Sequence, residues 1–270
     1  MSMIKQFVTI VCLVSILMLF PNVSSASWSI QSNAWISKIK SSLTRLRINS
    51  SVNDHLRDGL VGYWSFNGPD MNGGTVFDRS GGGNNLFFVD LASSTAYVAG
   101  KIGQGLYFDT GVTDYLEDSQ SSTAHNFGTG PFSTSIWFKT TFAGAGARMI
   151  NKRAVCVDDN FWEVAVGSGA FIGCVDDGTV SCVSSNATVN DDEWHHGVFT
   201  RDGLSLKVYV DGTLDNTVVA NTLADVSNST PLKIGDSVCA NDYVGDLDEV
   251  RVYNRALSAA EAKRLYNMGK

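Results

Sequence analysis

The chain has 270 residues, with 26 glycines, only 4 prolines, 10% aromatic residues and a formal net charge of -7. This composition excludes a disordered chain and suits one globular domain with additional segments. The acidic balance argues against nucleic acid as a partner, because domains that bind it carry basic surfaces.

The N-terminus has the three-part form of a secretory signal. Residues 1–6 contain a single lysine, residues 7–20 are mainly apolar, and Pro21 and small polar residues follow up to Ala26. A membrane-spanning helix needs about 20 apolar residues, so a signal peptide over residues 1–26 is favoured over a permanent anchor. We therefore expect a secreted or cell-surface protein.

Residues 27–57 differ in composition from the rest of the chain. Trp35, Ile39, Leu43 and Leu46 recur at near-helical spacing among lysines and arginines. The pattern predicts an N-terminal helical extension, either a linker or a basic amphipathic helix. Only this N-terminal segment is a candidate for contact with a membrane.

From Leu60 onward the apolar residues recur with period two. Phe132, Ile136 and Phe138 share one strand face, and Trp137 points to the other. The alternation of residues in 194–212 predicts a hairpin with Asp202 and Gly203 as its two-residue turn. Short strands separated by glycine and aspartate predict an all-β fold, a two-sheet antiparallel sandwich of jelly-roll type.

The last predicted strand, residues 245–253, places a carboxylate on an apolar face. Asp248 has the same parity as Val250 and Val252. An unpaired buried carboxylate costs several kcal/mol, so we expect Asp248 to meet a cation or hydrogen-bond donors. Ser258 and Glu261 then form a capping-box pattern, which predicts a short C-terminal helix.

Four cysteines follow the predicted signal peptide, and an exported protein favours two disulfides. Four cysteines allow three pairings. A turn at Asp177 and Gly178 favours Cys174 with Cys182, which leaves Cys156 with Cys239. A zinc site is the alternative, although no CxxC spacing is present.

Several motifs in order resemble one known family. They are GLVGYWSF (59–66), DRSGGGNN (78–85), GKIGQGLYFD (100–109), WHH (194–196) and GDLDEVRVYNRALSAAE (245–261). Over about residues 58–270 the chain resembles the LamG-like jelly-roll family of the concanavalin A-like lectin and glucanase superfamily. The resemblance implies an extracellular module that binds glycans or proteins, often with calcium.

Calcium is the metal that the residues favour, because it takes six to eight oxygen ligands and accepts backbone carbonyls. We expect Asp78, Gly83 and Asn85 to form one wall of a structural site and Asp248 the other. The alternative is that Asp78 caps its own turn and Asp248 accepts backbone N–H groups.

A glycan site needs an exposed aromatic platform with polar neighbours. Trp162 and Tyr243 are the preferred candidates because Asp and Asn residues flank them, and Tyr115 with Asp114 is a further candidate pair. Each such aromatic residue can instead belong to the core of the sandwich.

Catalysis has weaker support in the sequence. No ExDxxE motif supplies the paired carboxylates of a retaining glucanase. His195 and His196 point to opposite strand faces, which favours a surface His195 and a hydrogen-bonded core His196. We expect a non-catalytic module that binds a glycan or a surface protein, with a structural or assembly module and a glycoside hydrolase as alternatives.

Overall fold

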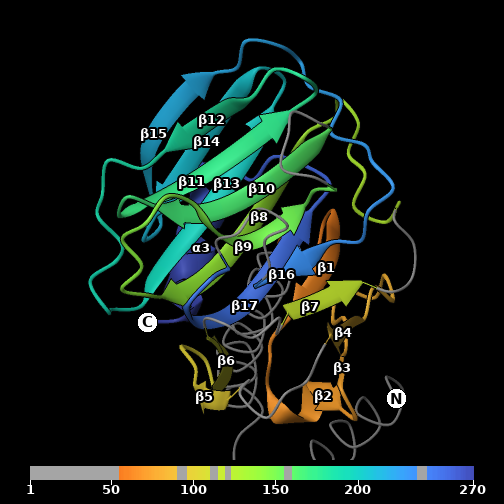
Figure 1. Ribbon diagram of the computed structural model, residues 1–270, viewed down its shortest axis with the longest axis vertical. Helices are drawn as coiled ribbons and strands as arrows, with labels where there is room; N and C mark the ends of the chain where they lie inside the picture. Colours follow the sequence, from red (N-terminus) through yellow and green to blue (C-terminus); the bar gives the residue numbers. More distant parts are fainter. Residues whose placement is uncertain (1–54, 90–95, 110–114, 119–122, 155–159, 236–241) are drawn as a thin grey trace, which may run out of the picture. The chain divides into compact units, whose positions relative to one another are not determined.

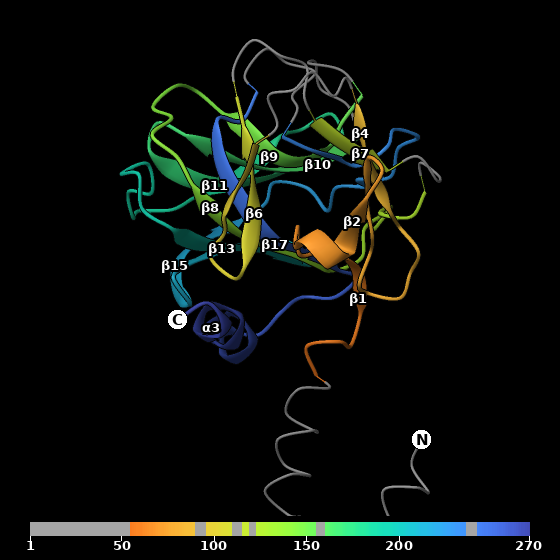
Figure 2. The same ribbon diagram turned by 90° about the horizontal axis from the view of Figure 1, so that it is seen from below.

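The computed structural model describes residues 55–89, 96–109, 115–118, 123–154, 160–235 and 242–270. In this part of the chain, two antiparallel sheets pack face to face, and a C-terminal helix covers the outer side of one sheet (Figures 1 and 2). The predicted sandwich is therefore confirmed. No helix in the described ranges is long and apolar enough to cross a membrane.

The first sheet contains eight of the described strands. Its order is β15–β14–β13–β8–β17–β6–β5, and β1 pairs with the C-terminal half of β17. The strands are β1 (Leu60–Trp64), β5 (Ala96–Ala99), β6 (Gln104–Phe108), β8 (Phe132–Lys139), β13 (His195–Asp202), β14 (Ser205–Val210), β15 (Thr213–Val219) and β17 (Gly245–Tyr253).

The second sheet has the order β12–β11–β10–β9–β16–β7–β4–β3–β2. The single-turn helix η1 (Gly68–Asp70) leads into it from β1. Its strands are β2 (Met71–Asn72), β3 (Thr75–Val76), β4 (Leu86–Val89), β7 (Tyr115–Asp118), β9 (Ala147–Lys152), β10 (Phe161–Gly167), β11 (Ala170–Asp176), β12 (Ser181–Ser184) and β16 (Lys233–Ile234).

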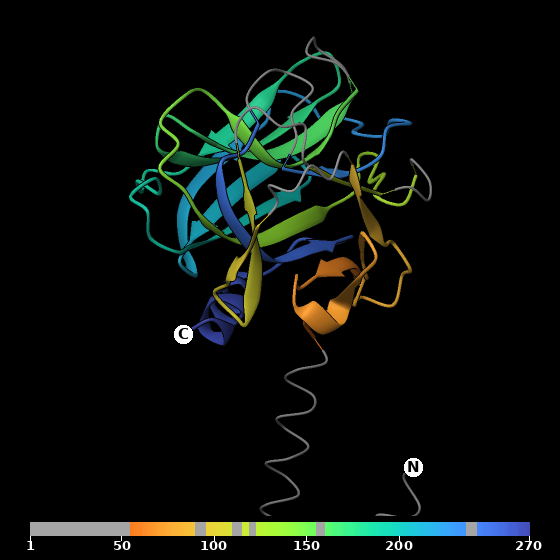
Figure 3. The same cartoon turned by 60° about the horizontal axis from the view of Figure 1, so that its bottom comes forward.

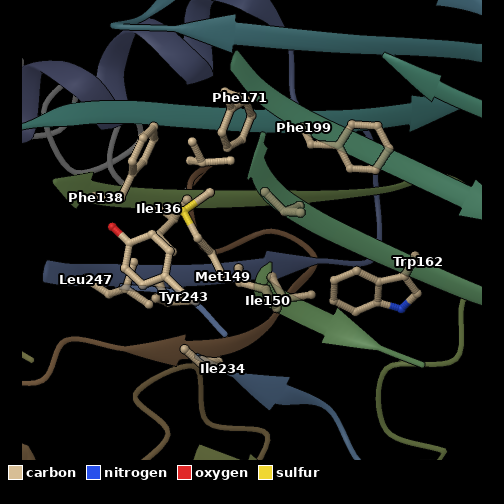
Figure 4. Packing of buried hydrophobic residues seen from close by; sticks show 14 of the residues in the cluster. Ile136, Phe138, Met149, Ile150, Trp162, Phe171, Phe199, Ile234, Tyr243 and Leu247 are labelled. Carbon is tan, nitrogen blue, oxygen red and sulfur yellow. The ribbon is translucent and has the colours of Figure 1, made fainter. Parts of the chain in front are cut away.

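Apolar side chains from both sheets fill the space between them (Figure 4). Phe132, Ile136 and Phe138 of β8 are fully buried in this core, as predicted. Trp137 points to the other side of the sheet and stacks on Tyr266, with 5.5 Å between the ring centroids. The period-two pattern of β8 therefore separates the core from the face that the helix covers.

A bulge in β17 overturns the predicted position of one carboxylate. The pairing with β8 shifts register directly after Asp248, where Glu249 adopts a φ of 55°. The extra residue reverses the alternation, so Val250 and Val252 reach the core while Asp248 lies opposite Trp137. The prediction that Asp248 shares a face with the valines is wrong for this reason.

The β13–β14 hairpin turns one residue later than predicted. Asp202 pairs with Ser205, so Gly203 and Leu204 are the turn residues. Gly203 adopts a φ of 58°, which glycine tolerates at no steric cost. The aspartate therefore closes the ladder instead of forming the turn.

The C-terminal helix α3 (Ala259–Met268) begins with the predicted capping box. The Ser258 side chain accepts a hydrogen bond from the Glu261 backbone N–H, and the Glu261 carboxylate accepts one from the Ser258 backbone N–H. Ala262 and Leu265 are buried and pack in a second apolar cluster with Tyr253. The helix thereby covers the outer face of the first sheet.

Candidate functional site

One predicted disulfide is present in the structure. Cys174 of β11 and Cys182 of β12 are paired across the two strands, with Cα atoms 4.2 Å apart. The turn between them contains Gly178 at a φ of 97°. Cys156 and Cys239 lie outside the described residues.

Trp162 and Tyr243 are not exposed platforms, because both side chains are fully buried. Trp162 packs against Phe132 at 5.4 Å between ring centroids, and its Nε1 donates to the His125 carbonyl at 3.2 Å. The Tyr243 hydroxyl donates to the Lys139 carbonyl at 3.0 Å. Polar neighbours in the sequence therefore do not make these aromatics part of the surface.

The other predicted aromatic, Tyr115, lies half-buried in β7. The Lys233 Nζ lies 4.2 Å from the centroid of its ring. This cation–π contact involves a ring face that a sugar would otherwise use. Asp114, its predicted partner, is outside the described residues.

Asp78 organises the loop that follows β3. Its Oδ1 accepts hydrogen bonds from the backbone N–H groups of Tyr63 and Ser80 at 3.0 and 2.7 Å. Its Oδ2 accepts from the Ser80 hydroxyl at 2.7 Å and the Asn84 N–H at 3.0 Å. The Asn85 side chain accepts from the Asp78 N–H at 2.9 Å. The carboxylate acts as a turn cap, and its four donors leave it poorly suited to an ion.

Asp248 binds a different segment from Asp78. Its Oδ2 accepts from the Ile102 N–H at 2.8 Å, while its buried Oδ1 has no hydrogen-bond partner within the described residues. Burial raises the pKa of this carboxyl to about 7. Gly83 adopts a φ of 77° in the Asp78 loop. The described residues contain no cluster of three His, Cys, Asp or Glu side chains suited to a metal, and calcium stays a prediction.

A polar hollow of about 350 Å³ lies beside β1. It is formed by the chain just before β1, the end of β1, the chain around η1 and the loop after β3. Figure 3 shows the β1 and η1 region, in orange, apart from helix α3. The lining residues are Arg57, Tyr63, Ser65, Asn67, Asp70, Asp78, Arg79 and Gly81. Of these residues, only Asp78 is a site residue predicted from the sequence.

Asp70 joins two sides of the hollow. Its Oδ2 accepts from the Ser65 hydroxyl at 2.6 Å, and its Oδ1 lies 3.2 Å from the Arg79 Nη1. Arg79 belongs to the DRSGGGNN motif. The DRSGGGNN motif, which holds both Asp78 and Arg79, was therefore the signal in the sequence that pointed to this hollow.

A buried ion pair lies behind Tyr63. The Tyr63 hydroxyl donates to the Glu249 carboxylate at 3.0 Å, and the Arg251 guanidinium lies 4.1 Å from the centroid of the Tyr63 ring. Glu249 and Arg251 pair with each other. Burial raises the pKa of Tyr63 to about 12, so the phenol stays protonated and fixed at the wall of the hollow.

The two adjacent histidines are held as predicted. His196 is fully buried, and its Nε2 lies 2.9 Å from the Ser135 hydroxyl beneath Trp137 and Tyr266. His195 is half-buried and contacts two aspartates at the surface. A serine–histidine pair that is closed to solvent cannot reach a substrate as a nucleophile.

The comparisons agree with this fold. A family model described as the concanavalin A-like lectin/glucanases superfamily matches residues 110–263. The chain belongs to this family. The search of curated proteins found no match.

Similar solved structures include the binding domains of a mosquitocidal protein and of a neurotoxin. The binding domain of Paraclostridial Mosquitocidal Protein 1 is 18% identical with a TM-score of 0.61, over 79% of this chain and 53% of that one. The binding domain of botulinum neurotoxin DC, solved with rat synaptotagmin II, is 13% identical with a TM-score of 0.62, over 79% and 52%. The chain thus spans about half the length of these toxin domains.

A third similar structure has nearly the size of the matched region. It is domain 4 of an extracellular arabinanase from Geobacillus stearothermophilus, in complex with arabinotriose. It is 18% identical with a TM-score of 0.61, over 77% of this chain and 98% of that one. At these identities the likeness concerns the fold alone, and binding properties do not transfer with it.

Proposed function

We propose that residues 56–270 are a non-catalytic binding module that holds a glycan in the hollow beside β1. The observation that carries this proposal is a concave polar site of about 350 Å³. Its volume lies within the roughly 300–1,000 Å³ of small-ligand sites. Its two arginines and its asparagine carry hydrogen-bond donors that suit the many hydroxyl groups of a sugar.

The setting of the module supports the same proposal. A structure of the same fold was solved with arabinotriose, and another similar structure concerns botulinum neurotoxin type C, whose cell entry is dependent upon interaction with two ganglioside molecules. The signal-like N-terminus and the Cys174–Cys182 disulfide suit an oxidising compartment. We accordingly place the protein at the cell surface or outside the cell.

A glycan array tests this function, followed by titration calorimetry on the glycans that bind. Arg79→Ala changes the hollow at a side chain that is 57% exposed, so the fold is expected to tolerate it. We expect affinity to fall about tenfold, since one charge-assisted hydrogen bond contributes about 1.5–3 kcal/mol. Lys207→Ala on β14 is the control and should bind like the wild type. Absence of binding to every glycan would refute the proposal.

One end of the sandwich favours a protein partner as a second candidate function. Val180, Leu204, Val219 and Leu223 are exposed there. The Ala220 N–H donates to the Leu204 carbonyl at 2.7 Å, and the Asn221 N–H to the Ser181 hydroxyl at 3.1 Å, so three turns meet. The acidic residues nearby are Asp177, Asp202 and Asp225. An apolar patch with an acidic rim fits a partner surface that is apolar and basic.

Binding to intact cells separates the two candidates. A labelled domain whose binding is lost after glycosidase treatment recognises glycan. Binding that survives glycosidase, is lost after trypsin treatment and is abolished by Val219→Asp would assign the apolar end instead. Val219 is suited to this test because it is 71% exposed and contributes little to the core.

A further inference from the structure

The hydrogen-bond acceptors that face the hollow are already occupied. Both oxygens of Asp78 accept bonds from its own loop and from Tyr63. Both oxygens of Asp70 are engaged by Ser65 and Arg79. The Asn67 Oδ1 accepts from the Gln104 N–H at 2.9 Å. The carboxylates therefore hold the hollow together and have little capacity left for a ligand.

The groups that remain open are donors. Among the described residues, the Arg57 guanidinium and the Asn67 Nδ2 have no hydrogen-bond partner. Arg79 is mostly exposed and forms an ion pair with Asp70 through Nη1, which leaves its other N–H groups without a partner among the described residues. Two arginines and one amide thus present donors to the same space. The two arginines of the lining are balanced in number by two aspartates, and Arg79 is paired with Asp70, so the Arg57 guanidinium is the positive group that stays open among the described residues.

We propose that the hollow selects acidic glycans, with the Arg57 guanidinium binding the carboxylate or sulfate of a sugar and Asn67 and Arg79 donating to the same group. A guanidinium presents a planar pair of N–H groups that matches an oxyanion in bidentate geometry. A neutral sugar would leave the Arg57 charge uncompensated when the site is covered. This inference rests on the proposed glycan site and adds the chemical class of its ligand.

Two variants of the full-length protein test the inference. Arg57→Gln removes the charge and keeps a polar side chain at an exposed position. Asn67→Asp keeps the oxygen that accepts from Gln104 but replaces the donor with a negative charge. Lys207→Gln on β14 removes one positive charge remote from the hollow, since β13 and β8 separate β14 from β17. Thermal unfolding of each variant checks that the fold is retained.

The probes are matched pairs of glycans that differ in the acidic group. Trigalacturonic acid is compared with its methyl ester, sialyllactose with lactose, and a sulfated lactose with lactose, all by titration calorimetry. We expect at least one acidic probe to bind about tenfold more tightly than its neutral partner, and less tightly as salt is raised. Arg57→Gln and Asn67→Asp should each lose this preference, and Lys207→Gln should keep it.

The outcomes separate this inference from the proposed function. Equal binding of acidic and neutral partners would overturn the acidic selectivity and leave a glycan site in place. A preference for acidic probes that persists in folded Arg57→Gln and Asn67→Asp would place the anion site elsewhere and overturn the assignment. Failure of every probe and every array glycan would refute the proposed function itself.

Discussion

Asp248 is a carboxyl group in an apolar, buried environment. It is fully buried, and its Oδ2 accepts from the Ile102 N–H in the β5–β6 turn. A Cβ atom at Gly100 would lie 2.7 Å from this oxygen, so the turn can approach the carboxyl only because residue 100 is glycine. Asp248 therefore ties the GKIGQG motif to β17, and burial raises its pKa to about 7.

This raised pKa predicts how stability depends on pH. Because the folded-state pKa exceeds the unfolded value, the contribution of Asp248 is fully present below about pH 4 and is lost as pH rises through about 7. Asp248→Asn cannot ionise, so from pH 4.5 to pH 8 we expect it to gain on the order of 3 kcal/mol relative to wild type. Urea unfolding at the two pH values measures this change. Asp202→Asn, at the exposed end of β13, is the control and should show no such change. Parallel profiles for wild type and Asp248→Asn would contradict the prediction.

At the scale of elements, alternation in the sequence predicts a strand well until a bulge interrupts it. In β8 the period of two correctly separates Phe132 from Trp137. In β17 the same rule fails after Asp248, because Glu249 takes a left-handed conformation and shifts the register. A non-glycine residue with positive φ has no clear sequence signal, since tertiary contacts select it. The pairing that holds Glu249 with Tyr63 and Arg251 exists only in the folded sheet.

The β11–β12 hairpin offers a prediction at the same scale. Cys174 and Cys182 are eight residues apart in sequence. In the loop-entropy model a bridge over so short a loop stabilises the fold by about 2.6 kcal/mol. Cys174→Ser with Cys182→Ser should lower the free energy of unfolding by about this amount in guanidinium titrations. Ser184→Ala, an exposed change on the same strand, should stay within about 0.5 kcal/mol of wild type, and an equally small loss in the double variant would contradict a stabilising bridge.

At the scale of the whole molecule, the architecture was predictable and the candidate site was not. Strand periodicity, turn residues and the order of the motifs suffice for two antiparallel sheets and a capped terminal helix. Whether Trp162 is buried or exposed depends on which face of its sheet meets the core, and the structure buries it. The polar residues that flank it in the sequence do not indicate which face that is. The hollow combines Arg57, Asn67 and Arg79, which lie in three segments without a shared pattern. Only their folded arrangement shows that their donors face one space.

Asp78 can stabilise the domain in two ways, as a ligand of calcium or as the cap of its own turn. As a calcium ligand, Asp78 would stabilise the protein only when the ion is present. As a turn cap with four donors from Tyr63, Ser80 and Asn84, it stabilises β1 and the loop without an ion. We therefore expect Asp78→Asn to lower the free energy of unfolding by about 2 kcal/mol, since it weakens charge-assisted hydrogen bonds.

This loss should be the same in excess calcium and in EDTA, as measured by chemical and thermal unfolding of wild type and variant in both. Asp202→Asn is the control for a change of charge alone, and should have little effect in either condition. A calcium-dependent rise in the wild-type melting temperature that disappears in Asp78→Asn would instead establish the ion as a ligand of this loop. The hydrogen bonds argue for the first outcome, because every donor to Asp78 would have to be displaced or shared before an ion could bind its oxygens.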